Sequence, residues 1–300
     1  MPPYLGESHQ SVETFLEKAK PVLKGFSDPF AIQEILARVD AIDEKNTAAK
    51  AAIDIALHDL VGKLACKPVH ELLHVEMIKS PSCTYTIGLG DLNLLPEKIK
   101  DAEEFPMLKV KLGSANDKQV ILELRRHTPK PIAVDVNQGW SDKHFALDMI
   151  HWLSVRNVVF VEQPLPKTMI DEMAWLTERS PIPTIADESV QRLKDVRNIR
   201  GIFSGINIKL MKCTGIREAM EMIAIARADK LKILIGCMSE TSCAVSAAAQ
   251  LSPLADWCDL DGPLLIKKDP FEGIKFVHGK IVLNDDAGIG VRPKEELGLK

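Results

Sequence analysis

The chain has 300 residues, of which 46% are hydrophobic, 27% are charged and 5% are aromatic, and its formal net charge is −4. This composition is typical of a globular protein and excludes a mainly disordered chain. The slightly acidic balance and the few aromatic residues disfavour nucleic acid as a partner, so we expect a small-molecule substrate.

The first 75 residues predict helices joined by turns, without a sheet of their own. Ser11 is a candidate N-cap for a helix that begins near Val12. Asn46 and Thr47 open a long alanine-rich stretch with apolar residues at helical spacing.

From about Ser80, short β-branched runs alternate with amphipathic helical stretches. We identify eight strand candidates, namely TYTIGLG, LKVKLG, PIAVDVNQG, VVFVEQP, PTIADES, GINIKL, LKILIGC and ADWCDLD. They repeat every 22 to 27 residues, which is the length of one βα unit. Such units form either a barrel or an open parallel sheet, and eight of them favour the barrel.

The eighth strand is not followed by a clear eighth helix. Residues 274–284 instead predict a hairpin that turns at His278 and Gly279. Because an isolated hairpin is marginally stable in water, we expect it to need a partner sheet, which the sequence does not obviously supply.

Three carboxylates occupy equivalent positions at the ends of strands three, four and five. Asp135, Glu162 and Asp187 are 27 and 25 residues apart, so they would lie side by side on the rim of the barrel. Neighbouring carboxylates repel each other unless a cation lies among them, and oxygen ligands favour Mg²⁺ over Zn²⁺. We therefore predict one Mg²⁺ ion here; three unrelated solvated strand ends are the alternative.

Three lysines accompany these carboxylates. Lys109 and Lys111 point to one face of strand two, whereas Lys209 ends strand six on the opposite side of an eight-strand ring. Lysines near other cations can act as general bases at neutral pH. Two opposed bases suit the removal of a proton from one face of a substrate and its return to the other.

The motifs K-V-K, D-V-N-Q-G-W, V-E-Q-P, I-A-D-E-S and N-I-K-L-M-K together resemble the enolase superfamily, and within it the muconate-lactonising branch. The resemblance implies an α/β fold, a modified TIM barrel of the (β/α)₇β type under a capping domain. It divides the chain into cap helices at 1–80, a catalytic barrel at 81–265, and a C-terminal segment at 266–300 that returns to the cap. It also implies an enolate, formed by removing the proton α to a carboxylate and stabilised by Mg²⁺.

The resemblance assigns roles to individual residues. It makes Asp135, Glu162 and Asp187 the metal ligands and Lys111 and Lys209 the two bases. Lys109 would contact the substrate carboxylate and lower the pKa of Lys111, while Asn137 and Glu188 would support the ligands from behind. No nucleotide cofactor is indicated, because the sequence has neither a P-loop nor a dinucleotide fingerprint.

Strand eight carries the motif D-L-D, which places Asp259 and Asp261 on one face. Paired carboxylates suit an ammonium group, and this motif resembles that of the dipeptide epimerases. It implies a dipeptide substrate with an acidic residue, of the L-Ala-D/L-Glu type. Thr86, Cys237, Met238 and Ser239 match further substrate-lining positions. The alternative is that the two aspartates merely end the strand before Gly262.

Other activities of the same branch stay open, because o-succinylbenzoate synthase, N-acylamino-acid racemase and muconate cycloisomerase share these lysines and ligands. The D-L-D motif disfavours all three. Relatives begin with a sheet and a loop that this sequence lacks, so we expect an N-terminally shortened form. A catalytically silent binding protein is therefore a further alternative. The sequence is also compatible with a homo-oligomer.

The six cysteines form no C-x-x-C pair, and the sequence shows neither a signal peptide nor an apolar run of about 18 residues. We therefore expect a cytoplasmic protein without disulfides or a membrane span. Residues 70–74 match the zinc motif H-E-x-x-H. Because Pro68 indicates only a short helix, we interpret these histidines as surface residues or as residues that pack in the cap.

Overall fold

The computed structural model describes residues 5–88 and 90–294. Its centre is a sheet of eight parallel strands that follow one another in chain order. The strands are β1 (Thr84–Ile87), β2 (Met107–Lys111), β3 (Ile132–Asp135), β4 (Val158–Glu162), β5 (Thr184–Ala186), β6 (Gly205–Ile208), β7 (Lys232–Gly236) and β8 (Trp257–Asp259). All eight predicted strands are confirmed.

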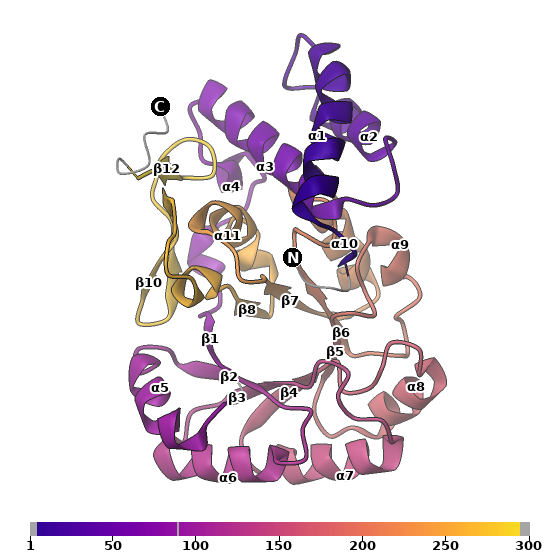
Figure 1. Ribbon diagram of the computed structural model, residues 1–300, viewed down its shortest axis with the longest axis vertical. Helices are drawn as coiled ribbons and strands as arrows, with labels where there is room; N and C mark the ends of the chain where they lie inside the picture. The colour runs from indigo at the N-terminus through magenta and orange to yellow at the C-terminus, as the bar shows by residue number, and fades with distance from the viewer. Residues whose placement is uncertain (1–4, 89, 295–300) are drawn as a thin grey trace.

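Helices cover the outside of this sheet and connect its consecutive strands (Figure 1). They are α5 (Leu95–Asp101), α6 (Asp117–His127), α7 (Lys143–Ser154), α8 (Ile170–Arg179), α9 (Leu193–Val196), α10 (Ile216–Ala228) and α11 (Ser242–Ala249). A 3₁₀ turn, Gly262–Leu265, follows β8 in place of a helix. The (β/α)₇β barrel is therefore confirmed.

The strands are buried on both faces, as expected for a parallel sheet under helices. Ile132, Ala133 and Val134 of β3, for example, are completely buried. The register pairs Lys111 with Asp135, and Asp135 with Glu162. The charged residues at the strand ends therefore meet at one rim.

The barrel closes where β1 meets β8. An isolated parallel bridge joins Cys83 to Cys258, and the Thr84 hydroxyl donates a hydrogen bond of 2.7 Å to Asp259 Oδ1. The Leu260 N–H donates to the sulfur atom of Cys83. Side chains therefore supply part of the bonding that a strand ladder supplies elsewhere in the barrel.

Four helices form a cap on the barrel (Figure 1). They are α1 (His9–Lys24), α2 (Ile32–Asp40), α3 (Thr47–Leu64) and α4 (Val69–Leu72). The predicted start of α3 at Thr47 is confirmed, but Ser11 as the N-cap of the first helix is wrong. Ser8 caps α1, and Ser11 lies in its first turn, where its hydroxyl accepts from the Ser8 N–H. The two serines thus form a reciprocal capping box that moves the helix start three residues back.

Helix α3 attaches the cap to the barrel at α10. The buried carboxylate of Asp54 accepts hydrogen bonds from the N–H groups of Ile216 and Arg217 at the start of α10. Gly215 (φ 119°) precedes this turn, and a Cβ atom there would overlap the Asp54 side chain. The Thr47 hydroxyl also donates to the Met211 carbonyl, so α3 supports the loop between β6 and α10.

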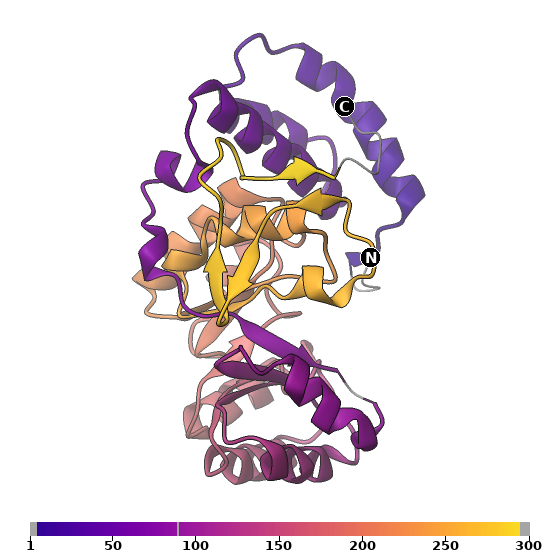
Figure 2. The ribbon, with the colours of Figure 1, turned by 90° about the vertical axis from the view of Figure 1, so that its left-hand side faces the viewer.

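The C-terminal region adds two short antiparallel pairs. β9 (Phe271–Glu272) pairs with β12 (Arg292–Pro293), and β10 (Lys275–Val277) pairs with β11 (Lys280–Val282) around the predicted turn at His278 and Gly279. Among the described residues β10 and β11 pair with each other and with no further strand, so the expected partner sheet stays a prediction. The hairpin packs on the barrel (Figure 2), where the Cys83 N–H donates to the Gly279 carbonyl and Phe276 packs on Phe105.

The remaining short elements are the 3₁₀ turns Met77–Lys79, Leu92–Leu94 and Ser252–Leu254. Within residues 5–88 and 90–294, none of the helices combines the length and the apolar character needed to cross a membrane.

Candidate active site

Three carboxylates from neighbouring strands meet at the rim of the barrel, as predicted. Asp135 ends β3, Glu162 ends β4 and Asp187 directly follows β5; they are at most 1% exposed. Nζ of Lys109 joins the first two, at 3.1 Å from Asp135 Oδ2 and 2.8 Å from Glu162 Oε2.

Each carboxylate has an outer oxygen that accepts a hydrogen bond from a fixed donor. Asp135 Oδ1 accepts from the Asn137 N–H at 3.0 Å, and Glu162 Oε1 accepts from Nδ2 of Asn207 at 2.7 Å. Asp187 Oδ1 likewise accepts a hydrogen bond, at 2.6 Å, from Lys212. The outer oxygens are therefore held by the chain itself.

The inner oxygens face the ammonium groups of the predicted lysines. Lys111 donates to Asp135 Oδ2 at 2.6 Å, and Lys209 donates to Asp187 Oδ2 at 2.7 Å. Glu162 Oε2 is buried and has no partner with hydrogen-bond geometry. With the lysines in these positions, no three His, Cys, Asp or Glu side chains of the described residues form a metal cluster.

The pKa values of Glu162 and Asp187 are shifted in opposite directions. Burial and the charge of Asp135 raise the pKa of Glu162 to about 7. Burial would also raise the pKa of Asp187, but two lysines hold it well below its ordinary value. A further cation beside Glu162 would therefore stabilise its ionised form.

These residues fit a hard divalent cation. Three carboxylates offer oxygen ligands only, their outer oxygens are already oriented, and Glu162 Oε2 is a buried acceptor without a hydrogen bond. To bind all three, the cation would take over the inner oxygens that the lysine ammonium groups now contact.

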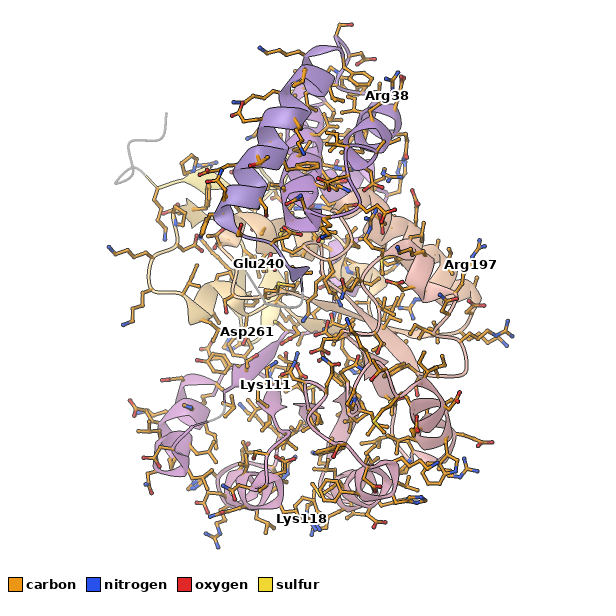
Figure 3. All side chains as sticks on the ribbon, turned by 45° about the vertical axis from the view of Figure 1, so that its right-hand side comes forward. Arg38, Lys111, Lys118, Arg197, Glu240 and Asp261 are labelled. Carbon is orange, nitrogen blue, oxygen red and sulfur yellow. The ribbon has the colours of Figure 1, made fainter. Side chains whose placement is uncertain are left out.

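A cavity of about 230 Å³ lies beside this cluster. It is lined by the catalytic candidates and by every residue predicted to contact substrate, that is, Lys109, Lys111, Lys209, Thr86, Cys237, Met238, Ser239, Asp259 and Asp261, together with Asn137, Asp187 and Leu265. Figure 3 shows Lys111 and Asp261 near the centre of the molecule, whereas Lys118 and Arg197 lie at its periphery.

The two lysines proposed as bases come from opposite strands, β2 and β6, and differ in their surroundings. The Lys111 side chain is 32% exposed, and its Nζ donates to Asn137 Oδ1 at 2.9 Å as well as to Asp135. The Asn137 amide in turn donates to Glu188 at 3.2 Å. Because that bond fixes the amide, its oxygen points at the lysine.

Lys109 is more enclosed than its neighbour, with 3% exposure. Besides its ion pairs with Asp135 and Glu162, it donates to Asp259 Oδ2 at 2.6 Å. Burial alone would lower the pKa of this lysine, but the three carboxylates raise it well above its ordinary value. Lys109 is therefore a cation that links the metal-ligand candidates to the D-L-D motif.

The two aspartates of that motif belong to the seam between β1 and β8. Asp259 accepts from Lys109 and Thr84, while Asp261 Oδ2 accepts from the Thr86 N–H at 2.6 Å. Burial and the charge of Asp259 raise the pKa of Asp261 to about 7. A cation in the cavity would stabilise this pair of carboxylates.

Sequence reasoning missed three supporting residues, which are Thr84, Asn207 and Lys212. Asn207 lies two residues before Lys209, so the alternation of β6 places both on the inner face. Lys212 is the second lysine of the motif N-I-K-L-M-K, and its charge directly after the apolar pair Leu210 and Met211 is a usable signal. Thr84 offered no such signal.

The H-E-x-x-H residues do not share one helix face. Helix α4 ends at Leu72, and His74 has a positive φ of 56°. The His70 N–H donates to Gln250 Oε1 at 2.8 Å, and its Nδ1 lies 3.0 Å from the same oxygen.

Two larger hollows, of about 410 and 500 Å³, flank Arg192 between the cap and α9. The Arg192 guanidinium is paired with Asp40 of the cap and Glu218 of α10. This cation therefore serves the attachment of the cap.

Comparison with known proteins gives matches over nearly the whole chain. A family model described as Mandelate racemase / muconate lactonizing enzyme, N-terminal domain, matches residues 6–74. A second, described as Enolase C-terminal domain-like, matches residues 95–297.

Similar proteins include curated relatives and a solved structure. The chain is 54% identical over 292 residues to L-Ala-D/L-Glu epimerase of Bacteroides thetaiotaomicron, which covers 97% of this chain and 76% of the relative. It is 38% identical to L-Ala-D/L-amino acid epimerase of Pedosphaera parvula, covering 88% and 78%. The dipeptide epimerase of Cytophaga hutchinsonii, complexed with Mg and the dipeptide D-Ala-L-Val, superposes with a TM-score of 0.88 at 25% identity, covering 97% and 82%. The chain therefore belongs to the mandelate racemase/muconate lactonizing enzyme family of the enolase superfamily.

Proposed function

We propose that the chain is a dipeptide epimerase that inverts the α-carbon of the C-terminal residue by two-base 1,1-proton transfer. The observation that carries this proposal is that Lys111 and Lys209, from opposite strands of the barrel, line the same cavity of about 230 Å³. The preferred substrates are of the L-Ala-D/L-Glu type, in keeping with the name of the Bacteroides relative.

Asp135, Glu162 and Asp187 would hold one Mg²⁺ ion. When bound, the ion supplies positive charge that stabilises the negative charge developing on the substrate carboxylate. The all-oxygen ligand set supports this proposal, as does Glu162 Oε2, which has an ion pair with Lys109 but no hydrogen bond. The Cytophaga structure, which is described as a complex with Mg, also supports it.

The lysines would act on opposite faces of the substrate. One lysine, in its neutral form, accepts the α-proton, and the other, in its ammonium form, donates a proton to the opposite face. Asn137 orients Lys111 by accepting a hydrogen bond from its ammonium group, and Glu188 fixes the Asn137 amide by accepting a second one. Both lysines border the cavity, which gives them access to one substrate carbon.

Asp259 and Asp261 would bind the α-ammonium group of the dipeptide. A buried carboxylate pair gains more from an ammonium group than from a neutral N-acyl group. This preference separates dipeptides from the N-acylamino acids and from the other acids used by the branch.

We further propose a cytoplasmic location, which the six free cysteines support.

The test is proton NMR in D₂O with Mg²⁺ and L-Ala-L-Glu. We expect the α-proton signal of the glutamate to disappear while the L-Ala-D-Glu diastereomer appears. Lys111→Ala and Lys209→Ala should each slow epimerisation by at least about 100-fold, because each removes one proton-transfer group. Exchange at one face of the substrate should survive in one of the variants. Unchanged turnover in either variant would exclude the two-base mechanism.

A further inference from the structure

Lys212 is a completely buried lysine that lies three residues after Lys209, in the loop between β6 and α10. Its Nζ donates to Asp187 Oδ1 at 2.6 Å, to the Asp187 carbonyl at 2.9 Å and to the Asn207 carbonyl at 2.9 Å. These three bonds use all three donors of the ammonium group. The lysine thus joins the end of β5 to the end of β6.

Asp187 is therefore contacted by two lysines in different settings. Lys209 approaches Oδ2 at 2.7 Å and lines the cavity, where substrate can reach it. Lys212 approaches Oδ1, has no exposed surface and does not line the cavity. Of the two lysines that contact Asp187, Lys209 is therefore the one with access to substrate.

We propose that Lys212 is a positioning residue that fixes the carboxylate of Asp187 for a divalent cation. It holds the outer oxygen and the main chain of Asp187, so the inner oxygen keeps its direction when Lys209 turns to the substrate. The proposal rests on the proposed function, because it takes Asp187 as a metal ligand. Lys212 itself touches neither substrate nor cation.

Removing the ammonium group would take a donor from Asp187 Oδ1 and from the Asn207 carbonyl, and would leave the Asp187 carbonyl with the Val190 N–H alone. The Asp187 side chain would then lose its fixed orientation. Residues that orient metal ligands in this way typically change metal affinity by about 10- to 100-fold. We therefore expect Lys212→Met to raise the Kd for Mg²⁺ within that range.

The cap provides a matched control in Lys50. This lysine is 2% exposed and also donates to one carboxylate oxygen, of Asp40, and to two carbonyls, of Asp40 and Asp43. None of these acceptors belongs to the carboxylate cluster. Lys50→Met and Lys212→Met should both lower the melting temperature, because each removes three buried hydrogen bonds, but Lys50→Met should leave the Kd for Mg²⁺ within about twofold of the parent.

The experiment is calorimetric titration of MgCl₂ into the metal-free parent chain, Lys212→Met, Lys50→Met and Glu162→Gln, with melting curves for each. Weak binding by Lys212→Met beside parent-like binding by Lys50→Met supports the inference. Equal binding by the parent and Lys212→Met overturns it. If the parent binds no Mg²⁺, or if Glu162→Gln binds it as the parent does, the proposed metal site is wrong instead, together with the inference that rests on it.

A second variant keeps the inference testable if Lys212→Met does not fold. Lys212→Gln retains an amide donor but no charge, and we expect a Kd between those of the parent and the 100-fold limit given above. Parent-like affinity in Lys212→Gln would overturn the inference. It would also be overturned if neither Lys212 variant folds while Lys50→Met does, because the lysine would then be a requirement of the barrel.

Discussion

Asp261 is a buried carboxyl group beside a second one, and its pKa of about 7 follows from burial and from the charge of Asp259. A raised pKa means that the group is mostly protonated at about pH 6 and mostly ionised at about pH 8. An ammonium group is attracted only by the ionised form. The α-amino group of a peptide, in turn, loses its own charge above about pH 8.

We therefore expect dipeptide affinity to be greatest between these two pKa values. At saturating Mg²⁺, the Kd for L-Ala-L-Glu should fall by up to about tenfold from pH 6 to pH 7.5, as Asp261 ionises, and rise again at higher pH. Asp261→Asn should bind the dipeptide weakly, and its Kd should no longer fall between pH 6 and pH 7.5. If the Kd of this variant still falls over that range, the titrating group is Glu162, whose pKa is also about 7.

The charged residues that close a strand could be predicted from the sequence, whereas their supporting partners could not. Asp135, Glu162 and Asp187 recur with the period of the barrel, and a period is visible in one dimension. Thr84 and Lys212 act through contacts across strand boundaries, which depend on register and side-chain rotamers. A single sequence does not specify those contacts.

Among the secondary-structure elements, α3 and α10 depend on each other. The carboxylate of Asp54 in α3 satisfies two N–H groups at the start of α10, where the helix has no partners of its own for them. The contact is buried and joins the cap to the barrel. It replaces the capping residue that the sequence before α10 lacks, because Gly215 has no side chain.

Asp54→Ala should lower the free energy of unfolding by about 2 kcal/mol, which is at the upper end for a helix cap. The reason is that the Ile216 and Arg217 N–H groups would lose their acceptor in a buried place. Urea denaturation followed by circular dichroism measures this change. Asp142→Ala is the matched control, since Asp142 caps α7 with one bond to the Phe145 N–H in an exposed position. A smaller loss in Asp54→Ala than in Asp142→Ala would contradict a cap-to-barrel role for Asp54.

Element types were predicted more reliably than element ends and contacts. Eight strands and the hairpin follow from β-branched runs and turn residues. The start of α1 was misplaced because Ser8 and Ser11 both have capping side chains, and only their reciprocal bonds decide which is the cap. The contacts of the hairpin with Phe105 and Cys83 are long-range, so the sequence does not show where the hairpin packs.

At the scale of the whole molecule, the barrel order follows from the repeat, but the attachments of the cap do not. Arg192 pairs with Asp40 and Glu218 across three separate elements. These partners are 152 and 26 residues away along the chain, and no periodicity relates them. The sequence therefore predicts that the helices exist without predicting where they sit on the barrel.

At the centre of the molecule, four ammonium groups lie among the carboxylates and form ion pairs with four of them. The paired carboxylates are Asp135, Glu162, Asp187 and Asp259, and the ammonium groups are Lys109, Lys111, Lys209 and Lys212. The protein thus carries internal counterions, which neutralise its acidic cluster in the absence of a divalent cation. An incoming dication adds positive charge to a region that already holds these ammonium groups, and the carboxylate of a dipeptide offsets part of that charge.

Metal and substrate should therefore bind cooperatively, each raising the affinity for the other by the same factor, of about 5- to 150-fold. Calorimetric titration of Mg²⁺ with and without the equilibrated epimers of Ala-Glu measures this coupling. Equal Mg²⁺ affinities in the two titrations would contradict it. With cooperative binding, the fraction of protein that holds metal depends on the concentration of dipeptide as well as on that of the metal.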